Sequence, residues 1–193
     1  MSDVLTKPCY TPEDLLRMPE GDLYELVDGH LVERKMGARS SFIGGVLLGL
    51  LLRFLAQRPL GWAWPADCGY QCFPDAPNKV RKPDVSFLRF GRLPGDRLPP
   101  GHIPIPPDLA VEVISPNDLA DEVDEKVEEY LGAGVRLVWV VHPQNRTVLI
   151  YRPNGSVSGL RERDELDGED VLPGFRCRVA EVFAAPTPPA ARA

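Results

Sequence analysis

Two carboxylates in apolar surroundings are the residues of this sequence best suited to chemistry. Glu112 stands within the apolar run 109–114, where an uncompensated carboxylate costs several kcal/mol to bury. Asp84 follows Pro83 and precedes a second apolar run, 85–90. If the two runs are neighbouring strands, the acids meet in an oxygen-rich site of the kind that binds Mg²⁺ or Mn²⁺. Such a site favours phosphodiester hydrolysis by a metal-activated water.

Two further residues are candidates for the same site. Glu25 shares strand parity with Leu23 and Val27, so it is predicted to point towards the core, although a partly exposed strand carboxylate is an equally good interpretation. Lys126 lies four residues after Glu122, which is the spacing of a surface ion pair on a helix. Lys126 is also placed to reach back from its helix to the carboxylates, where it would stabilise the charge of a pentavalent phosphate.

The elements that must position these residues follow from turn and periodicity signals. Thr11 and Pro12 are typical of the start of a short helix that runs to about Met18. Asp28-Gly29 is the dipeptide of a two-residue hairpin turn. The rest of the pattern predicts hairpin strands at 23–27 and 30–34, a helix over 40–57, strands around 69–73 and 85–90, a strand at 109–114, a helix over 118–132, strands at 135–141 and 146–151, and a last short element near 171–183.

The predicted helix after the hairpin is nearly all apolar, which suits a helix packed under a sheet. Gly44, Gly45 and Gly49 lower its helix propensity, and close contact with the sheet would explain them. The apolar run 42–52 is too short to span a bilayer, and residues 1–10 lack the apolar core of a signal peptide. We therefore expect a cytoplasmic protein without membrane association.

Composition indicates a globular chain. Its 193 residues, 44% of them hydrophobic and 26% charged, predict a single domain over 1–183, followed by an Ala- and Pro-rich tail, 184–193, that is expected to be disordered. The four cysteines lack the paired spacing of a zinc site and are interpreted as free thiols. A net charge of -6 argues weakly against a partner held by bulk electrostatics alone, but the segment 79–97 is locally basic and is a candidate for tracking phosphates.

Several stretches together resemble the Uma-two family of endonucleases, which is placed in the PD-(D/E)XK nuclease superfamily. The motifs that carry the resemblance stand in the family's order at 24–32, 82–86, 108–116, 126–130 and 134–141. The resemblance implies an α/β fold with a restriction-endonuclease-like core, in which helices flank a mixed β-sheet. It also implies that Asp84 and Glu112 bind the metal, that Glu25 matches the acid contributed near the start of the chain, and that the backbone carbonyl of Val113 completes the metal shell.

The sequence departs from the superfamily pattern at one position. A lysine is expected two residues after the second acid, and Ile114 stands there instead. Lys126 is interpreted as a substitute placed by the following helix. His142 stands where relatives commonly have Asp, and no role is assigned to it.

The leading hypothesis is a Mg²⁺- or Mn²⁺-dependent endonuclease that cleaves DNA, with Asp84 and Glu112 as metal ligands, Glu25 assisting and Lys126 stabilising the transition state. Symmetry favours a homodimer for double-strand cutting. A first alternative is a catalytically inactive nuclease fold that acts as a nucleic-acid-binding or regulatory module. A second is an interaction domain in which Glu112 simply pairs with Arg81 or Lys82.

Overall fold

The fold is described from a computed structural model, which covers residues 9–35 and 37–185. The expected disorder of the tail concerns residues that, apart from Ala184 and Ala185, lie outside the described part of the chain.

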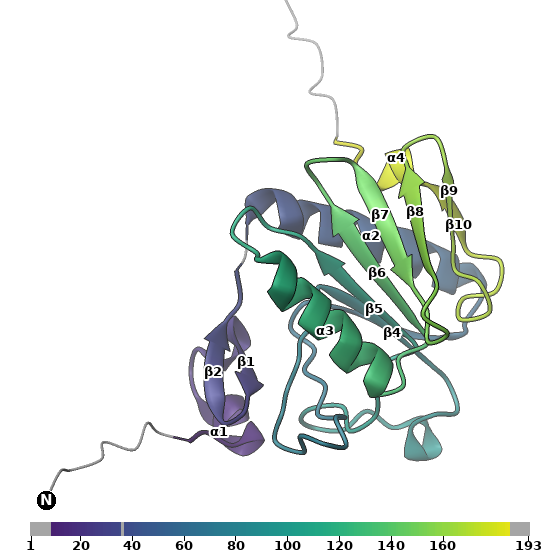
Figure 1. The fold of residues 1–193 in the computed structure, drawn as a ribbon. Coiled ribbons are helices and arrows are strands. Elements are labelled where there is room, and N and C mark those ends of the chain that lie inside the picture. Colours follow the sequence, from purple (N-terminus) through teal and green to yellow (C-terminus); the bar gives the residue numbers. More distant parts are fainter. Residues whose placement is uncertain (1–8, 36, 186–193) are drawn as a thin grey trace, which may run out of the picture.

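A six-stranded mixed sheet forms the centre of the molecule (Figure 1). Its spatial order follows the chain: β3 (Gly61–Pro65), β4 (Val85–Arg89), β5 (Leu109–Val113), β6 (Leu137–His142), β7 (Thr147–Tyr151) and β8 (Val157–Arg161). Only β5 and β6 run parallel, and the other neighbours are antiparallel. The helix α3 (Ala120–Gly132) joins β5 to β6, so the predicted succession of a strand at 109–114, a helix over 118–132 and a strand at 135–141 is confirmed, and it forms a β-α-β unit.

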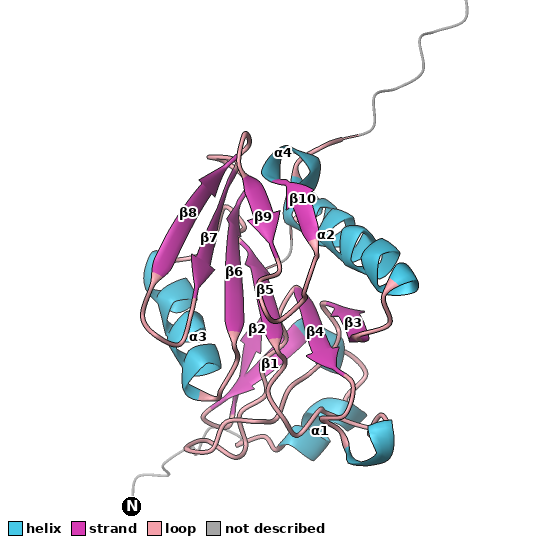
Figure 2. Ribbon diagram, turned by 90° about the vertical axis from the view of Figure 1, so that its right-hand side faces the viewer, coloured by secondary structure: helices cyan, strands magenta, loops and turns pink. Residues whose placement is uncertain are grey.

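Helices cover both faces of this sheet (Figures 1 and 2). The long helix α2 (Ala38–Gln57) lies on one face and α3 lies on the other. Alternate residues of β5 pack against α2 on one face of the sheet and against α3 on the other, because successive side chains along a strand point to opposite faces. Leu109, Val111 and Val113 pack with the leucines of α2, while Ala110 packs with the buried side of α3. Glu112 shares the parity of Ala110 and therefore belongs to the α3 side.

The C-terminal segment completes the layer that contains α2. It forms the small antiparallel pair β9 (Glu165–Asp167) and β10 (Arg176–Arg178), followed by α4 (Val179–Val182). Leu166, Cys177 and Val182 are buried in the same core cluster as Leu47 and Leu51 of α2. The predicted short element near 171–183 is thus two elements, whose partner strand was not predicted.

The N-terminal segment forms a small unit beside the sheet (Figure 1). It contains α1 (Pro12–Arg17), the 3₁₀ turn η1 (Gly21–Leu23), and the hairpin β1 (Tyr24–Val27) and β2 (His30–Glu33). The turn residues Asp28 and Gly29 have φ of 49° and 75°, so the predicted two-residue hairpin is confirmed. Leu26 and Val80 exchange both backbone hydrogen bonds, at 2.9 and 2.8 Å, and this bridge joins β1 to the body of the protein.

The predicted strand around 69–73 is wrong. Within it, only Tyr70 makes isolated bridges, to Arg81 and Ile103. The edge strand of the sheet is instead β3, a segment with two half-buried tryptophans that follows α2 almost directly. The other edge, β8, was also missed, because it is largely exposed and carries few apolar residues. Edge strands have weak sequence signals since only one neighbour selects their side chains.

The helix α2 differs from its prediction in two respects. It is a continuous helix of 20 residues, long and apolar enough by length and composition alone to cross a membrane, although its buried side, including Ile43 and Leu47, forms the core over the sheet. A Cβ added at Gly45 or Gly49 would meet no atom within 4 Å, so close contact with the sheet does not explain these glycines. Of the three glycines, Gly44 alone faces the sheet, since a Cβ added there would lie 4.0 Å from the backbone oxygen of Asp84.

Candidate active site

Asp84 and Glu112 lie side by side because β4 and β5 are antiparallel neighbours. Val85 pairs with Val111, so the next position along each strand sets Asp84 opposite Glu112. Asp84 Oδ2 accepts a hydrogen bond from the backbone amide of Val113 at 2.8 Å. The predicted meeting of the two acids is confirmed.

Glu112 is held from the α3 side. Its Oε1 accepts a hydrogen bond from the Tyr130 hydroxyl at 2.8 Å, and its Oε2 lies 3.4 Å from Lys126 Nζ. Lys126 and Tyr130 are four residues apart and therefore share one face of the helix. Burial raises the pKa of Glu112 to about 7, against the opposing effect of the lysine charge.

Lys126 links two acids from different elements. Its Nζ lies 3.3 Å from Glu25 Oε2 as well as 3.4 Å from Glu112 Oε2. Burial opposes the charged form, but the two carboxylates outweigh it and raise the lysine pKa, so the side chain is charged at neutral pH. The predicted surface pair with Glu122 is wrong, since Glu122 pairs with Lys35 instead.

Glu25 points into the core of the site. It is 1% exposed, so its interpretation as a partly exposed strand residue is wrong. Its oxygens accept hydrogen bonds from Arg81 at 3.0 Å and from the backbone amide of Lys82 at 2.8 Å, in addition to the contact with Lys126. Burial favours the neutral acid, but these cations and the amide hold its pKa below the ordinary value. Glu25 thereby fixes the position of the lysine.

Asp84 faces a cation that was not predicted. Arg34, just after β2, places its Nη2 3.4 Å from Asp84 Oδ1, and its side chain is only 6% exposed. Burial raises the pKa of Asp84 in spite of the Val113 amide and this guanidinium. Arg34 and Tyr130 were not predicted as site residues, because both reach the acids through packing between segments that are distant in the sequence.

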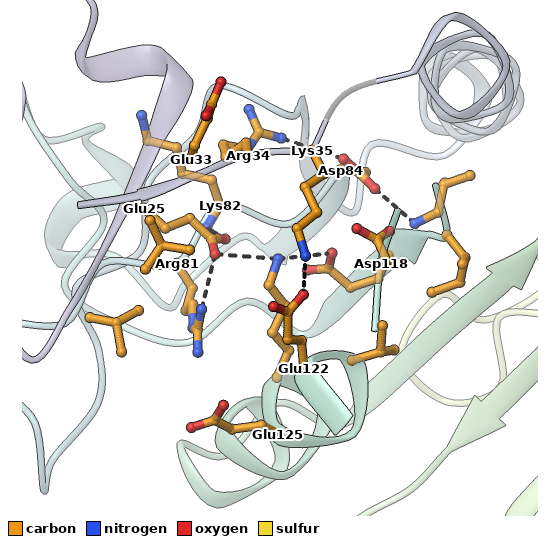
Figure 3. Close-up of a pocket in the computed structure, with 17 residues that line it drawn as sticks. Glu25, Glu33, Arg34, Lys35, Arg81, Lys82, Asp84, Asp118, Glu122 and Glu125 are labelled. Atoms are coloured by element: carbon orange, nitrogen blue, oxygen red, sulfur yellow. Dashed lines mark hydrogen bonds and ion pairs between the residues drawn. The ribbon is translucent and has the colours of Figure 1, made fainter. Parts of the chain in front are cut away.

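The four predicted side chains line one cavity of about 240 Å³ (Figure 3). In Figure 3 the side chains of Glu25, Arg34, Lys35 and Asp84 reach into the same space between the hairpin, the ends of the strands and α3. Val113 and Ile114 also line the cavity. The position at which the resemblance predicts a lysine thus lines the cavity, but its residue, Ile114, is apolar.

The donor set fits a small divalent cation. Each of Asp84 and Glu112 has one oxygen held by a neutral donor and another that faces a positive charge. Within residues 9–35 and 37–185, no group of three or more His, Cys, Asp or Glu is placed to hold a metal. Asp84 and Glu112 would offer a cation two carboxylates, and Mg²⁺ commonly takes one or two. The Val113 carbonyl as a further ligand stays a prediction.

The basic segment has mainly structural contacts near the site. Arg81 and Lys82 are 4% and 3% exposed, and Lys79 pairs with Glu129. Arg81 binds Glu25 and Glu129, while Lys82 Nζ donates to the Gly21 carbonyl. These three residues do not form an exposed track for phosphates. The alternative in which Arg81 or Lys82 pairs with Glu112 is wrong, because Lys126 and Tyr130 occupy that place.

Comparisons with known proteins identify the family and the fold of this chain. Residues 12–180 match the model of the Uma2 family, which is described as "Putative restriction endonuclease". The crystal structure of "a putative nuclease belonging to DUF820" from Anabaena variabilis has a TM-score of 0.75 and 20% sequence identity to this chain, and covers 90% of this chain and 97% of its own. No curated protein matches the chain. The mixed sheet flanked by helices is thus an α/β fold shared with a nuclease-like neighbour, and the chain belongs to the Uma2 family.

Proposed function

We propose that the protein is a metal-dependent endonuclease that hydrolyses phosphodiester bonds in DNA, with Mg²⁺ or Mn²⁺ as cofactor. The observation that carries this proposal is the pairing of Asp84 with Glu112 at one cavity, where an oxygen of each acid faces a positive charge. Membership of the Uma2 family supports the reaction class.

In this proposal, Asp84, Glu112 and the Val113 carbonyl hold the cation. When bound, a divalent cation polarises the phosphoryl oxygen and lowers the pKa of a water molecule. Lys126 keeps its charge in the cavity because Glu25 and Glu112 both contact it. A fixed positive charge at this place would stabilise the negative charge that develops on the phosphate.

Lys126 is also proposed to replace the lysine that the resemblance predicts at position 114, where this chain has Ile114. The expected lysine would extend from β5 itself, whereas Lys126 comes from α3 and reaches the same acid at 3.4 Å. Glu25 fixes Lys126 from the opposite side, at 3.3 Å. We therefore assign the role of the missing lysine to Lys126, which lies between the carboxylates of Glu25 and Glu112.

A nuclease assay on supercoiled and single-stranded DNA, with Mg²⁺ and with Mn²⁺, tests the proposal. Asp84→Asn and Glu112→Gln keep the side-chain volume and remove the charge, so each is expected to lower cleavage by roughly a hundredfold or more, about 2.7 kcal/mol in activation free energy. Asp121→Asn removes an exposed acid of α3 outside the cavity and is the matched control. A chelator should abolish cleavage by the wild type.

Equal cleavage by the wild type and both cavity variants would refute the proposed site. A salt-dependent DNA complex that forms without metal and never leads to cleavage would favour the inactive nucleic-acid-binding module instead. Double-strand cutting is further proposed to need a homodimer, which light scattering would detect as a mass of twice the 21.4 kDa chain.

A further inference from the structure

Arg34 is a buried cation whose hydrogen-bonding capacity is only partly used. Its side chain is 6% exposed and lines the cavity that contains Asp84 and Glu112. Nη2 contacts Asp84 Oδ1 at 3.4 Å, which is a long distance for a hydrogen bond. Nη1 is buried and has no hydrogen-bond partner in the described part of the chain. An unpaired buried donor on a charged group is costly, so this arrangement calls for a ligand.

The contact with Asp84 is of a kind that a metal ion would disrupt. Asp84 Oδ1 is the oxygen of this acid that Val113 does not hold, and it is therefore the oxygen open to a cation. A divalent ion and a guanidinium repel each other at such short range. A metal bound at Asp84 would thus weaken the hold of Asp84 on Arg34.

Once Asp84 binds a cation, a phosphate group is a suitable ligand for the Arg34 guanidinium. The guanidinium is planar and always charged, and it presents two N–H groups in a fork that fits two phosphate oxygens. The cavity already contains the two carboxylates proposed to hold the cation, so a phosphodiester bound beside that cation would lie within the space that Arg34 lines.

We propose that Arg34 is a phosphate-binding residue of this site, which Asp84 holds in the metal-free protein and releases to the DNA backbone when a divalent cation binds. The inference rests on the proposed function for the position of the cation and the substrate. It assigns to the N-terminal hairpin unit a direct part in substrate binding, because Arg34 follows β2.

The proposal gives Arg34 opposite effects on two ligands. Arg34→Met removes a charge that competes for Asp84, so Mn²⁺ titrated into the DNA-free protein by calorimetry should bind roughly three- to tenfold more tightly. Arg34→Lys keeps the charge and should leave Mn²⁺ affinity close to that of the wild type. Arg17→Met, which removes an exposed charge of α1 outside the cavity, is the matched control.

DNA affinity should change in the other direction. Fluorescence anisotropy with a labelled duplex is measured over a salt series in Ca²⁺, and a denaturing gel verifies that the duplex stays intact. Arg34→Met should bind about tenfold more weakly, with a salt slope smaller by about 0.9, as expected for one lost phosphate contact. Arg34→Lys should fall between it and the wild type, and Arg17→Met should match the wild type. In a chelator the effect of Arg34→Met should largely disappear.

If Arg34 had a purely structural role, Arg34→Met would change the affinities for Mn²⁺ and for DNA in the same direction. Thermal unfolding of the variant would show whether it has lost its fold. Mn²⁺ affinity that is unchanged or weaker in Arg34→Met overturns the inference. So does a loss of DNA affinity that is equal with and without Ca²⁺, or a wild type that binds no DNA.

The failure of this inference is distinguishable from that of the proposed function. If the wild type cleaves DNA and requires Asp84 and Glu112, but Arg34→Met shows no opposed changes, only the role of Arg34 is wrong. If the opposed changes occur and the wild type never cleaves, the nuclease activity is wrong and Arg34 remains a residue for metal-coupled nucleic-acid binding.

Discussion

At the scale of single residues, the site contains three acids whose burial is compensated in three ways. Glu25 has two cations and a backbone amide, Glu112 has a lysine and a tyrosine hydroxyl, and Asp84 has an amide and an arginine. Removing one partner of such a group leaves a charge in an apolar environment, which costs more than the pair itself contributes. Single substitutions around these acids should therefore have large effects on stability.

Lys126→Met is expected to lower the free energy of unfolding by about 3 kcal/mol, because Glu25 and Glu112 then face each other without the shared cation. Urea unfolding at neutral pH measures the change. Adding Glu112→Gln in the same chain should recover part of the loss by removing one of the two charges. A loss below about 1 kcal/mol would contradict a compensating role for the lysine.

Tyr130→Phe removes the hydroxyl that donates to Glu112 Oε1 and leaves the buried ring in place. We expect a loss of about 1 kcal/mol in the free energy of unfolding. The control is Tyr151→Phe, since the Tyr151 hydroxyl has no hydrogen-bond partner among the described residues. Equal effects of the two substitutions would show that the hydrogen bond to Glu112 contributes nothing.

At the scale of elements, the hairpin β1–β2 has to present both Glu25 and Arg34 to the site. Its turn depends on Asp28 and Gly29, both at positive φ. A tight turn of this type matches the right-handed twist of the strands and sets their register. Since a shift of one residue reverses the face of every side chain, the turn decides whether Glu25 is buried.

Gly29→Ala is expected to destabilise the protein by about 1 kcal/mol, because φ is 75° and a Cβ would lie 2.3 Å from Cys9 Sγ. The same substitution at Gly45 should raise stability by roughly 0.5 to 1 kcal/mol, since this glycine is helical and its Cβ would meet no atom within 4 Å. Thermal unfolding of both variants compares them. A Gly29→Ala variant at least as stable as the wild type would show that the turn does not require glycine.

At the scale of the whole molecule, a chain of ion pairs ties three distant segments together. Arg81 contacts Glu25 of the hairpin and Glu129 of α3, and Lys79 contacts Glu129 as well. Arg81 is itself buried, so the link lies inside the structure and not on its surface. These ion pairs position the hairpin against α3. The cavity lies between the hairpin and α3.

Stability should therefore depend on the charge of Glu129. Burial favours its neutral form, but hydrogen bonds from Arg81 and Lys79 outweigh it, so the folded pKa lies below the ordinary 4.5. A lowered folded pKa contributes stability above the unfolded pKa, and this contribution is lost as the pH falls through the folded value. Glu129→Gln should consequently cost more at pH 7 than at about pH 3.

Urea unfolding at the two pH values measures this difference. Glu128→Gln, an exposed neighbour on the same helix, is the control and should have little effect at either pH. A cost of Glu129→Gln that does not change with pH would contradict an ionic link.

The sequence by itself determined the features that depend on neighbours along the chain. The Asp28-Gly29 turn, the helix that contains Lys126 and the strand that contains Glu112 all depend on local backbone preferences and periodicity. A carboxylate in an apolar strand also signalled a compensated site without any structure, because desolvation penalises every uncompensated charge.

Only the tertiary structure decided which groups compensate which acids. The spacing of Lys126 from Glu122 is that of a helix ion pair, yet Lys126 contacts Glu25 and Glu112. Arg34 contacts Asp84, which lies 50 residues further along the chain. Local spacing cannot predict such pairs, because the register of β4 with β5 and the docking of the hairpin bring the groups together. Burial then selects the pairing, since a charge in the interior requires the partner that packing places beside it.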